Sequence, residues 1–69
     1  MTINVTINMP DKCEYKGRVS FWDRDKPGDD WRDSGIADRY LSQGEVATIA
    51  VWDTRGLTIS EHYGAIPSN

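Results

Sequence analysis

Few residues of this chain have the types and spacing that catalysis or metal binding requires. His62 is the single histidine and Cys13 the single cysteine, so neither has a second nitrogen or sulfur ligand at metal-binding spacing. Ser60 and Glu61 precede His62, but neighbouring side chains of an extended segment point to opposite faces, which argues against a hydrolytic triad. Cys13 has no base within reach by sequence, so a packed thiol is favoured over a nucleophile. We expect a protein that is not an enzyme.

The acidic segment after residue 22 offers one pattern that could suggest a metal. Asp23 and Asp25, followed by Pro27-Gly28, are similar to the start of a calcium loop of the EF-hand type, which places oxygen ligands at alternate positions and glycine at the sixth. Pro27 and Ser34 occupy the fifth and twelfth positions, and no flanking helix is expected. A solvated acidic loop is therefore favoured, and we expect no metal and no cofactor.

Aromatic and arginine side chains alternate with aspartates in the same region. Trp, Tyr and Arg dominate the energetics of protein–protein interfaces, because each combines a large contact area with a polar tip. We therefore predict a partner-binding surface here. Its candidate residues are Trp22, Arg24, Asp29, Asp30, Trp31, Arg32, Asp33 and Arg39. The alternative for Trp31 is that it folds back to cover a small core.

The positions of these residues depend on a series of β-patterned segments. Apolar residues alternate with polar ones from Ile3 to Met9 and again over residues 15–22, which predicts two strands that are placed to form a loose hairpin. Residues 23–35 lack apolar periodicity and contain Pro27-Gly28, so they are predicted to form a long acidic loop. Residues 36–41 fit a strand or one helical turn, and we favour the strand.

The last third of the chain carries the strongest β pattern. Residues 46–52 are rich in β-branched and aromatic side chains, which predicts a central strand. Asp53 to Gly56 suits a type I turn closed by Gly56 in the left-handed region, with residues 57–61 as the returning strand. Residues 62–69 are expected to form a loose tail, which Tyr63 and Ile66 could hold against the core.

Together these segments predict a single all-β domain over residues 1–69, with about five short antiparallel strands in a small sandwich or barrel. A chain of 69 residues buries a small core, and open strand edges are expected, so a homodimer is a reasonable arrangement. If the second and fourth predicted strands share one sheet, Trp22 and Trp52 would lie together on an exposed face.

Composition limits the class of function. The net charge is −3, with 11 acidic against 8 basic side chains, which disfavours direct binding to nucleic acid. An unpaired cysteine suits a reducing compartment, and no apolar run is long enough to cross a membrane, so we expect a cytoplasmic protein with no membrane partner.

Two resemblances extend this interpretation. Residues 40–51 (Tyr-Leu-Ser-Gln-Gly-Glu-Val-Ala-Thr-Ile-Ala-Val) resemble an edge element of bacterial β-sandwich modules, with Gln43 where those modules usually have proline. The whole chain, small and acidic, is similar in style to the orphan accessory proteins of bacteriophages, which include anti-defence inhibitors such as anti-CRISPR proteins. The second resemblance implies action on a host protein, but it assigns no role to any residue.

The favoured function is therefore a phage-type inhibitor or adaptor that binds a host or viral protein, with its carboxylates masking a basic surface meant for nucleic acid. One alternative is a structural or virion module that oligomerises through its strand edges. Another is a binder of small ligands or carbohydrates that uses Trp22, Trp31 and Trp52 as stacking platforms.

Overall fold

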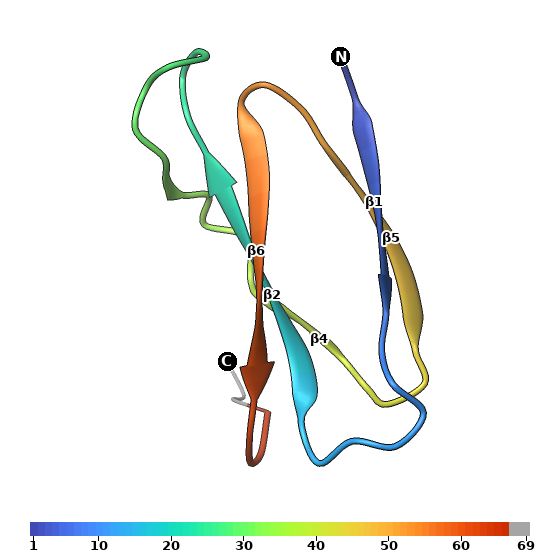
Figure 1. The fold of residues 1–69 in the computed structure, drawn as a ribbon. Coiled ribbons are helices and arrows are strands. Elements are labelled where there is room, and N and C mark those ends of the chain that lie inside the picture. The colour runs from blue at the N-terminus through green and yellow to red at the C-terminus, as the bar shows by residue number, and fades with distance from the viewer. Residues whose placement is uncertain (67–69) are drawn as a thin grey trace.

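The alternating segments fold into strands, and the all-β class is confirmed (Figure 1). The computed structural model describes residues 1–66. Within that range it contains no helix, and hence none that could cross a membrane. The six strands found there are β1 (Ile3–Asn8), β2 (Lys16–Asp23), β3 (Arg32–Asp33), β4 (Arg39–Leu41), β5 (Val46–Val51) and β6 (Arg55–His62).

The first sheet consists of β1 and β5 alone. They pair antiparallel from Ile3 opposite Val51 to Asn8 opposite Val46. The strand predicted from residue 3 onward is confirmed, but the predicted hairpin with β2 is wrong, because β1 takes a partner from the other end of the chain. The prediction of a central strand at residues 46–52 is also wrong, since among the described residues β5 pairs along its length with β1 alone.

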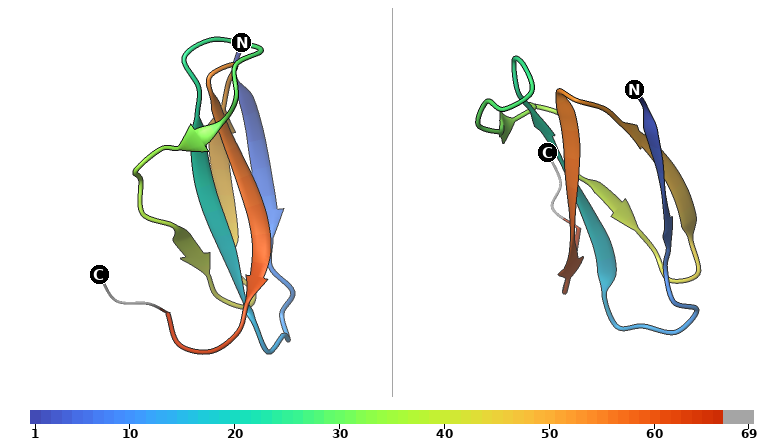
Figure 2. Two further views of the ribbon diagram at one scale, coloured as in Figure 1. Left: turned by 90° about the vertical axis from the view of Figure 1, so that its left-hand side faces the viewer. Right: turned by 45° about the horizontal axis from the view of Figure 1, so that its top comes forward.

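The second sheet is built around β2. On one side β2 pairs along its whole length with β6, from Lys16 opposite His62 to Asp23 opposite Arg55. On its other side it pairs first with β4 and then, further along, with β3. Figure 2 shows β3 and β4 following one another along the same edge of β2. This sheet therefore has a continuous edge on one side and an interrupted edge on the other.

Two predictions for the middle of the chain change as a result. Residues 36–41 contain a strand, as favoured, but it is limited to β4, and the alternative of a helical turn is wrong. Residues 23–35 are not one irregular loop, because β2 continues to Asp23 and the chain returns to pair with it as β3. The acidic loop is thus the connection of residues 24–31 between two paired strands.

The core lies between the two sheets, which face each other without closing into a barrel (Figure 1). Ile7, Met9 and Ala47 contribute to it from the first sheet and its end, and Val19 and Leu41 from the second. Ile7 alternates with the partly buried Val5, and Val19 with the partly buried Phe21, so one face of each sheet is turned inward. Val19 and Leu41 have no exposed surface at all.

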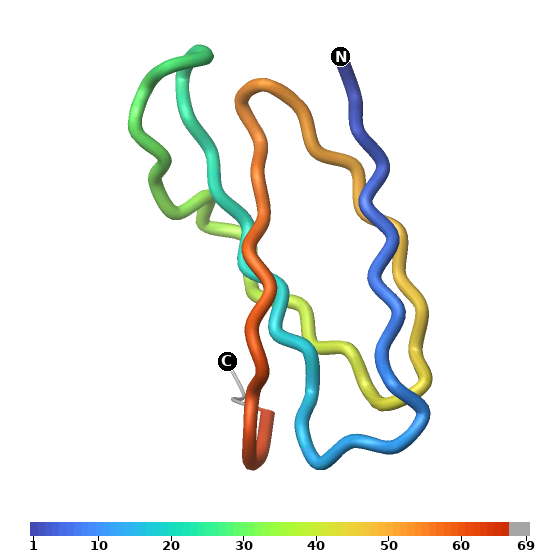
Figure 3. The backbone as a smooth tube through the Cα atoms, viewed as in Figure 1, coloured from blue at the N-terminus to red at the C-terminus, as the bar shows by residue number. Residues whose placement is uncertain are grey.

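The connection between β5 and β6 carries the chain from one sheet to the other (Figure 3). Trp52 and Arg55 exchange two backbone hydrogen bonds of 3.0 Å, so only Asp53 and Thr54 lie in the turn. The prediction that Gly56 closes this turn in the left-handed region is wrong, because Arg55 closes it and Gly56 has no positive φ. β5 and β6 therefore meet at this bridge and otherwise pair with different strands, contrary to the expectation of a hairpin.

The end of the chain is more regular than predicted where the structure describes it. β6 includes His62, and the ring of Tyr63 lies 5.7 Å from that of Tyr15, just before β2. Tyr63 is itself 62% exposed, so it contacts the edge of the core and is not buried in it. Ile66 remains largely exposed. The rest of the predicted loose tail, residues 67–69, lies outside the described residues.

Gly17 of β2 is required by the packing of Met9. A Cβ atom at Gly17 would lie 2.7 Å from the sulfur of Met9 and 3.7 Å from the Cβ of Leu41. Replacing Gly17 by valine overfills the core, and we expect the free energy of unfolding to fall by about 1–3 kcal/mol. Urea denaturation followed by circular dichroism measures this change.

The control for that prediction is Gly28→Ala, which adds a Cβ where no atom lies within 4 Å. Gly28 has a positive φ of 95°, so this change tests backbone strain without crowding. Combining Gly17→Val with Met9→Ala frees the space that the valine needs. If the loss of unfolding free energy in the double variant equalled the sum of the losses in Gly17→Val and Met9→Ala, crowding by Met9 would not explain the effect of Gly17→Val.

Candidate partner-binding site

Trp22 anchors the site on the outer face of the second sheet. It alternates with the inward-facing Val19 and Phe21 of β2 and lies opposite Gly56 of β6. Its indole N–H donates a hydrogen bond of 3.0 Å to the hydroxyl of Thr58 on β6. The ring is thereby held across the β2–β6 pair, with its only polar atom already satisfied.

Trp31 reaches the same face from the acidic loop. It immediately precedes β3, and its six-membered ring would lie 3.3 Å from a Cβ atom at Gly56. Glycine at this strand position lets the ring approach the backbone of β6 closely. Trp31 covers the outer face of the sheet and is not part of the core cluster, although 43% of its surface remains exposed.

Arg24 fixes the position of the loop. Its guanidinium carbon lies 4.1 Å from the centre of the Trp31 ring, a favourable cation–π arrangement. The same side chain donates a hydrogen bond of 2.7 Å to the carbonyl of Asp53, and the Arg24 backbone N–H donates to the carbonyl of Thr54. Trp31 is thus held between Arg24 and β6, so the loop presents it in one orientation.

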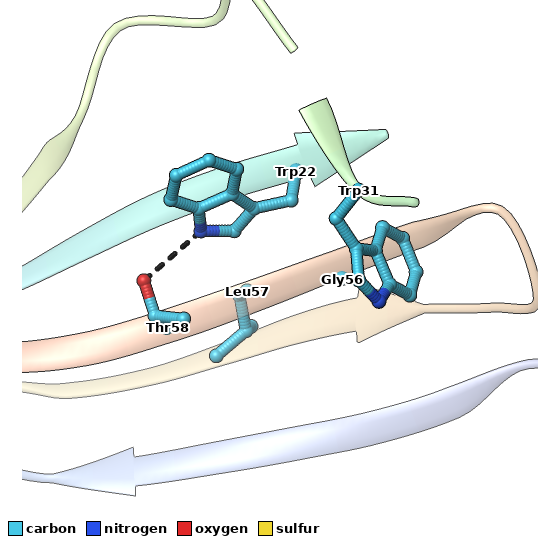
Figure 4. Close-up of a pocket in the computed structure, with 5 residues that line it drawn as sticks. All are labelled: Trp22, Trp31, Gly56, Leu57 and Thr58. Atoms are coloured by element: carbon cyan, nitrogen blue, oxygen red, sulfur yellow. Dashed lines mark hydrogen bonds between the residues drawn. The ribbon is translucent and has the colours of Figure 1, made fainter. Parts of the chain in front are cut away.

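Between the two indoles lies a groove that opens to solvent, which we call the tryptophan groove (Figure 4). Its volume is about 320 Å³ and its walls are mostly carbon. It is lined by Trp22, Trp31, Gly56, Leu57 and Thr58. The groove is large enough for one apolar side chain and offers few free hydrogen-bonding groups.

Some of the aspartates around the groove have partners within the protein, and others do not. Asp25 forms an exposed ion pair of 2.9 Å with Arg32, and Asp33 accepts a hydrogen bond of 2.9 Å from the Gly35 backbone. Within residues 1–66, Asp29 and Asp30 take part in no ion pair. These two carboxylates, directly before Trp31, are therefore the ones available to a positively charged partner.

Not all predicted site residues gather at the groove. Arg39 lies on β4 opposite Val19, where its guanidinium is 3.7 Å from Glu45. Trp22 and Trp52 do not share a sheet face, because β2 and β5 belong to different sheets and Trp52, which follows β5, contacts Arg55. Sequence reasoning missed Gly56 and Thr58, although a glycine inside a strand pattern is a recognised signal of close approach.

A second hollow, of about 420 Å³, has Cys13 and His62 among the residues that line it. The Cys13 thiol donates to the carbonyl of Tyr15 at 3.2 Å, and the His62 ring nitrogen Nε2 lies 3.0 Å from the carbonyl of Ala65. In the part of the chain that the structure describes, no three metal-ligating side chains come close enough to hold an ion.

Comparison of the chain with protein-family models, curated proteins and solved structures finds no significant match. The proposal for its function therefore depends on the geometry of the tryptophan groove and on the charge of the loop beside it.

Proposed function

We propose that this chain is a non-enzymatic protein-binding module that captures one apolar side chain of a partner protein in the tryptophan groove. The observation that supports this most directly is the packing of Trp31 between Arg24 and Gly56, which orders an exposed indole before any partner arrives. An ordered aromatic side chain loses little conformational freedom on binding, which is the property of interface hot spots.

The chemistry of the groove favours a protein side chain over a sugar or nucleotide. Sugars bound by stacking also need several hydrogen-bond partners for their hydroxyl groups, but the Trp22 N–H is taken by Thr58 and the Arg24 Nε by Asp53. Among the lining side chains this leaves the Trp31 N–H and the Thr58 hydroxyl as donors. The remaining walls are mostly carbon. Transfer of an apolar side chain into such a groove requires no new polar partner.

The charge of the loop indicates the surroundings of that side chain on the partner. Asp29 and Asp30 are free to face lysine or arginine, and opposite charges accelerate encounter. A basic surface that normally binds nucleic acid has this character. In line with the resemblance to bacteriophage accessory proteins, we propose that the module acts as an inhibitor or adaptor by covering such a surface on a host protein.

Affinity capture from bacterial lysate followed by mass spectrometry identifies the partner, and variants then test the groove. We expect Trp31→Ala to weaken binding by about 30-fold or more, as for a central aromatic anchor. Gly56→Val keeps both indoles but places methyl groups where Trp31 lies, so it should weaken binding similarly. Trp52→Ala, which removes an exposed indole elsewhere, is the matched control.

Salt dependence separates the acidic contribution from the apolar one. Asp29→Asn with Asp30→Asn should lower the association rate at low salt and reduce its dependence on salt, whereas Asp25→Asn should change it less because Asp25 is paired with Arg32. Unchanged binding by both Trp31→Ala and Gly56→Val would exclude the groove as the binding site.

A further inference from the structure

The outer edge of β6 is open from Leu57 onward. β6 pairs with β2 on one side, and on the other side Trp52 occupies the position beside Arg55. Because Arg55 exchanges two backbone hydrogen bonds with Trp52, its N–H and C=O point away from β2. Backbone groups of alternate residues point to the same side of a strand, so those of Leu57, Ile59 and Glu61 also face outward. Within residues 1–66 no strand pairs with them.

The core is uncovered along the same edge. Ile59 lies opposite the buried Val19, on the inner face of the second sheet, yet 48% of its surface is exposed. Ile3, which alternates with Val5 and Ile7 on the inner face of β1, is 61% exposed. In the left view of Figure 2, β1 lies behind β6 and extends past its outer edge. A strand added beside β6 therefore faces β1 and covers apolar side chains that the chain itself leaves exposed.

The tryptophan groove reaches this edge from the outer face (Figure 4). Leu57 and Thr58, two consecutive residues of β6, are both among its lining residues. Thr58 presents its side chain on the outer face, where it accepts the hydrogen bond of Trp22. In a strand paired with β6, the residue opposite Thr58 shares that face and lies beside the groove, whereas the residues opposite Leu57 and Ile59 turn toward the core. One short segment can thus fill the groove and cover the core together.

The charges around the open edge favour a basic segment. Glu61, at one end, accepts a hydrogen bond from Tyr63 but forms no ion pair within residues 1–66. At the other end, Asp29 and Asp30 come directly before Trp31, which covers the start of β6. Opposite charges on facing strand residues stabilise their pairing. Lysine or arginine is therefore favoured at both ends of an added strand.

We propose that β6 accepts an extended, basic segment of a partner protein as an additional strand. The segment runs antiparallel to β6, like every other pairing of this sheet, and bonds through its backbone to Leu57, Ile59 and Glu61. Its residue opposite Thr58 enters the tryptophan groove, and the apolar residues before and after that one cover the core. This rests on the proposed function, because the groove residue is the apolar side chain that the module captures.

The probe for this proposal is the hexapeptide Lys-Thr-Val-Leu-Val-Lys, acetylated and amidated at its ends. In the proposed register its first lysine lies opposite Glu61, its leucine opposite Thr58, and its second lysine opposite Gly56 beside the acidic loop. Titration of the isotope-labelled chain followed by nuclear magnetic resonance measures binding. We expect a dissociation constant of about 1 mM or lower, and slower hydrogen exchange at the amides of Leu57, Ile59 and Glu61.

Methylation of peptide nitrogens separates strand pairing from the groove. The two valines direct their N–H groups toward β6, so N-methylation of both should raise the dissociation constant about tenfold or more. The threonine and the leucine direct theirs away, and N-methylation of those two should raise it by less than about threefold. Replacing the leucine by serine leaves the backbone pairing intact and removes the apolar contact with the groove.

A charge exchange tests the register. Glu61→Lys should weaken binding of the hexapeptide about threefold or more, and a peptide that begins with glutamate should restore it. Glu14→Lys makes the same charge change outside β6 and should leave both dissociation constants unaltered.

An absence of binding by the hexapeptide, or equal losses from the two methylated peptides, would overturn the proposal. So would protection of the Leu57 amide that increases with protein concentration in the free chain, because the edge would then be occupied by a second copy. If methylated valines weaken binding but serine in place of leucine does not, strand pairing holds and the groove of the proposed function is excluded. The reverse result excludes strand pairing and retains the groove.

Discussion

Leu41→Ala is expected to unfold a large fraction of the protein at room temperature. Leu41 is fully buried between the sheets, and removing a leucine from such a position costs about 2–5 kcal/mol. A single core in a chain of this size rarely supplies more than about 3–5 kcal/mol of stability. One substitution therefore removes most of the free energy of unfolding. Circular dichroism would show this as a loss of the β-sheet signal.

The control for this prediction is Ile36→Ala, which removes the same number of carbon atoms from a residue that is 44% exposed and lies outside the core cluster. We expect it to change the free energy of unfolding by no more than about 0.5 kcal/mol. If the two variants were equally stable, the core would not depend on the contact between β4 and the first sheet. Ligand-free protein is used, because a bound partner would stabilise the folded state.

Asp23→Ala is the second substitution with a large expected effect. Asp23 accepts hydrogen bonds from two nitrogens of Arg55, and about a quarter of each side chain is exposed (25% and 24%). The pair joins the end of β2 to the start of β6. Losing the carboxylate leaves a poorly solvated guanidinium, so we expect a loss of about 1–3 kcal/mol, measured by urea denaturation.

The chain contains its own control for that effect. Asp25 and Arg32 form a similar ion pair that is mostly exposed (76% and 58%), and Asp25→Ala should change stability by no more than about 0.5 kcal/mol. Double-mutant cycles on the two pairs isolate each coupling energy. A coupling for Asp23–Arg55 no larger than that for Asp25–Arg32 would show that partial burial adds nothing here.

The strands were predictable from sequence to a greater extent than their partners. Alternation marks β1 and much of β2 because one face of each is buried, and this is a local signal. Pairing is not local: β1 selects β5 and β2 selects β6, across more than half of the chain. The tight turn at Asp53-Thr54 looks like a hairpin signal, but it carries the chain between sheets instead.

In the candidate site, too, local features were predictable from the sequence and contacts between distant segments were not. Residue type identified Trp22, Arg24 and Trp31, which the structure brings together at the tryptophan groove. Residue type did not distinguish Asp29 and Asp30 from Asp25 and Asp33, which form contacts within the protein. Those contacts depend on the path of the chain between β2 and β3, which the sequence does not reveal. The prediction also included Arg39, because it lies close to the loop in sequence. In the structure Arg39 is on β4, away from the groove.

The pairing order of the strands has a consequence for how a newly made chain folds. β1 and β2 are synthesised before β5 and β6, which are their main partners. β1 cannot complete its ladder until residue 51 is available, and β2 cannot complete its own until residue 62 is available. Folding of both sheets therefore waits until β6 has been made, and the closure of these long loops makes it slower than in a helical protein of equal length.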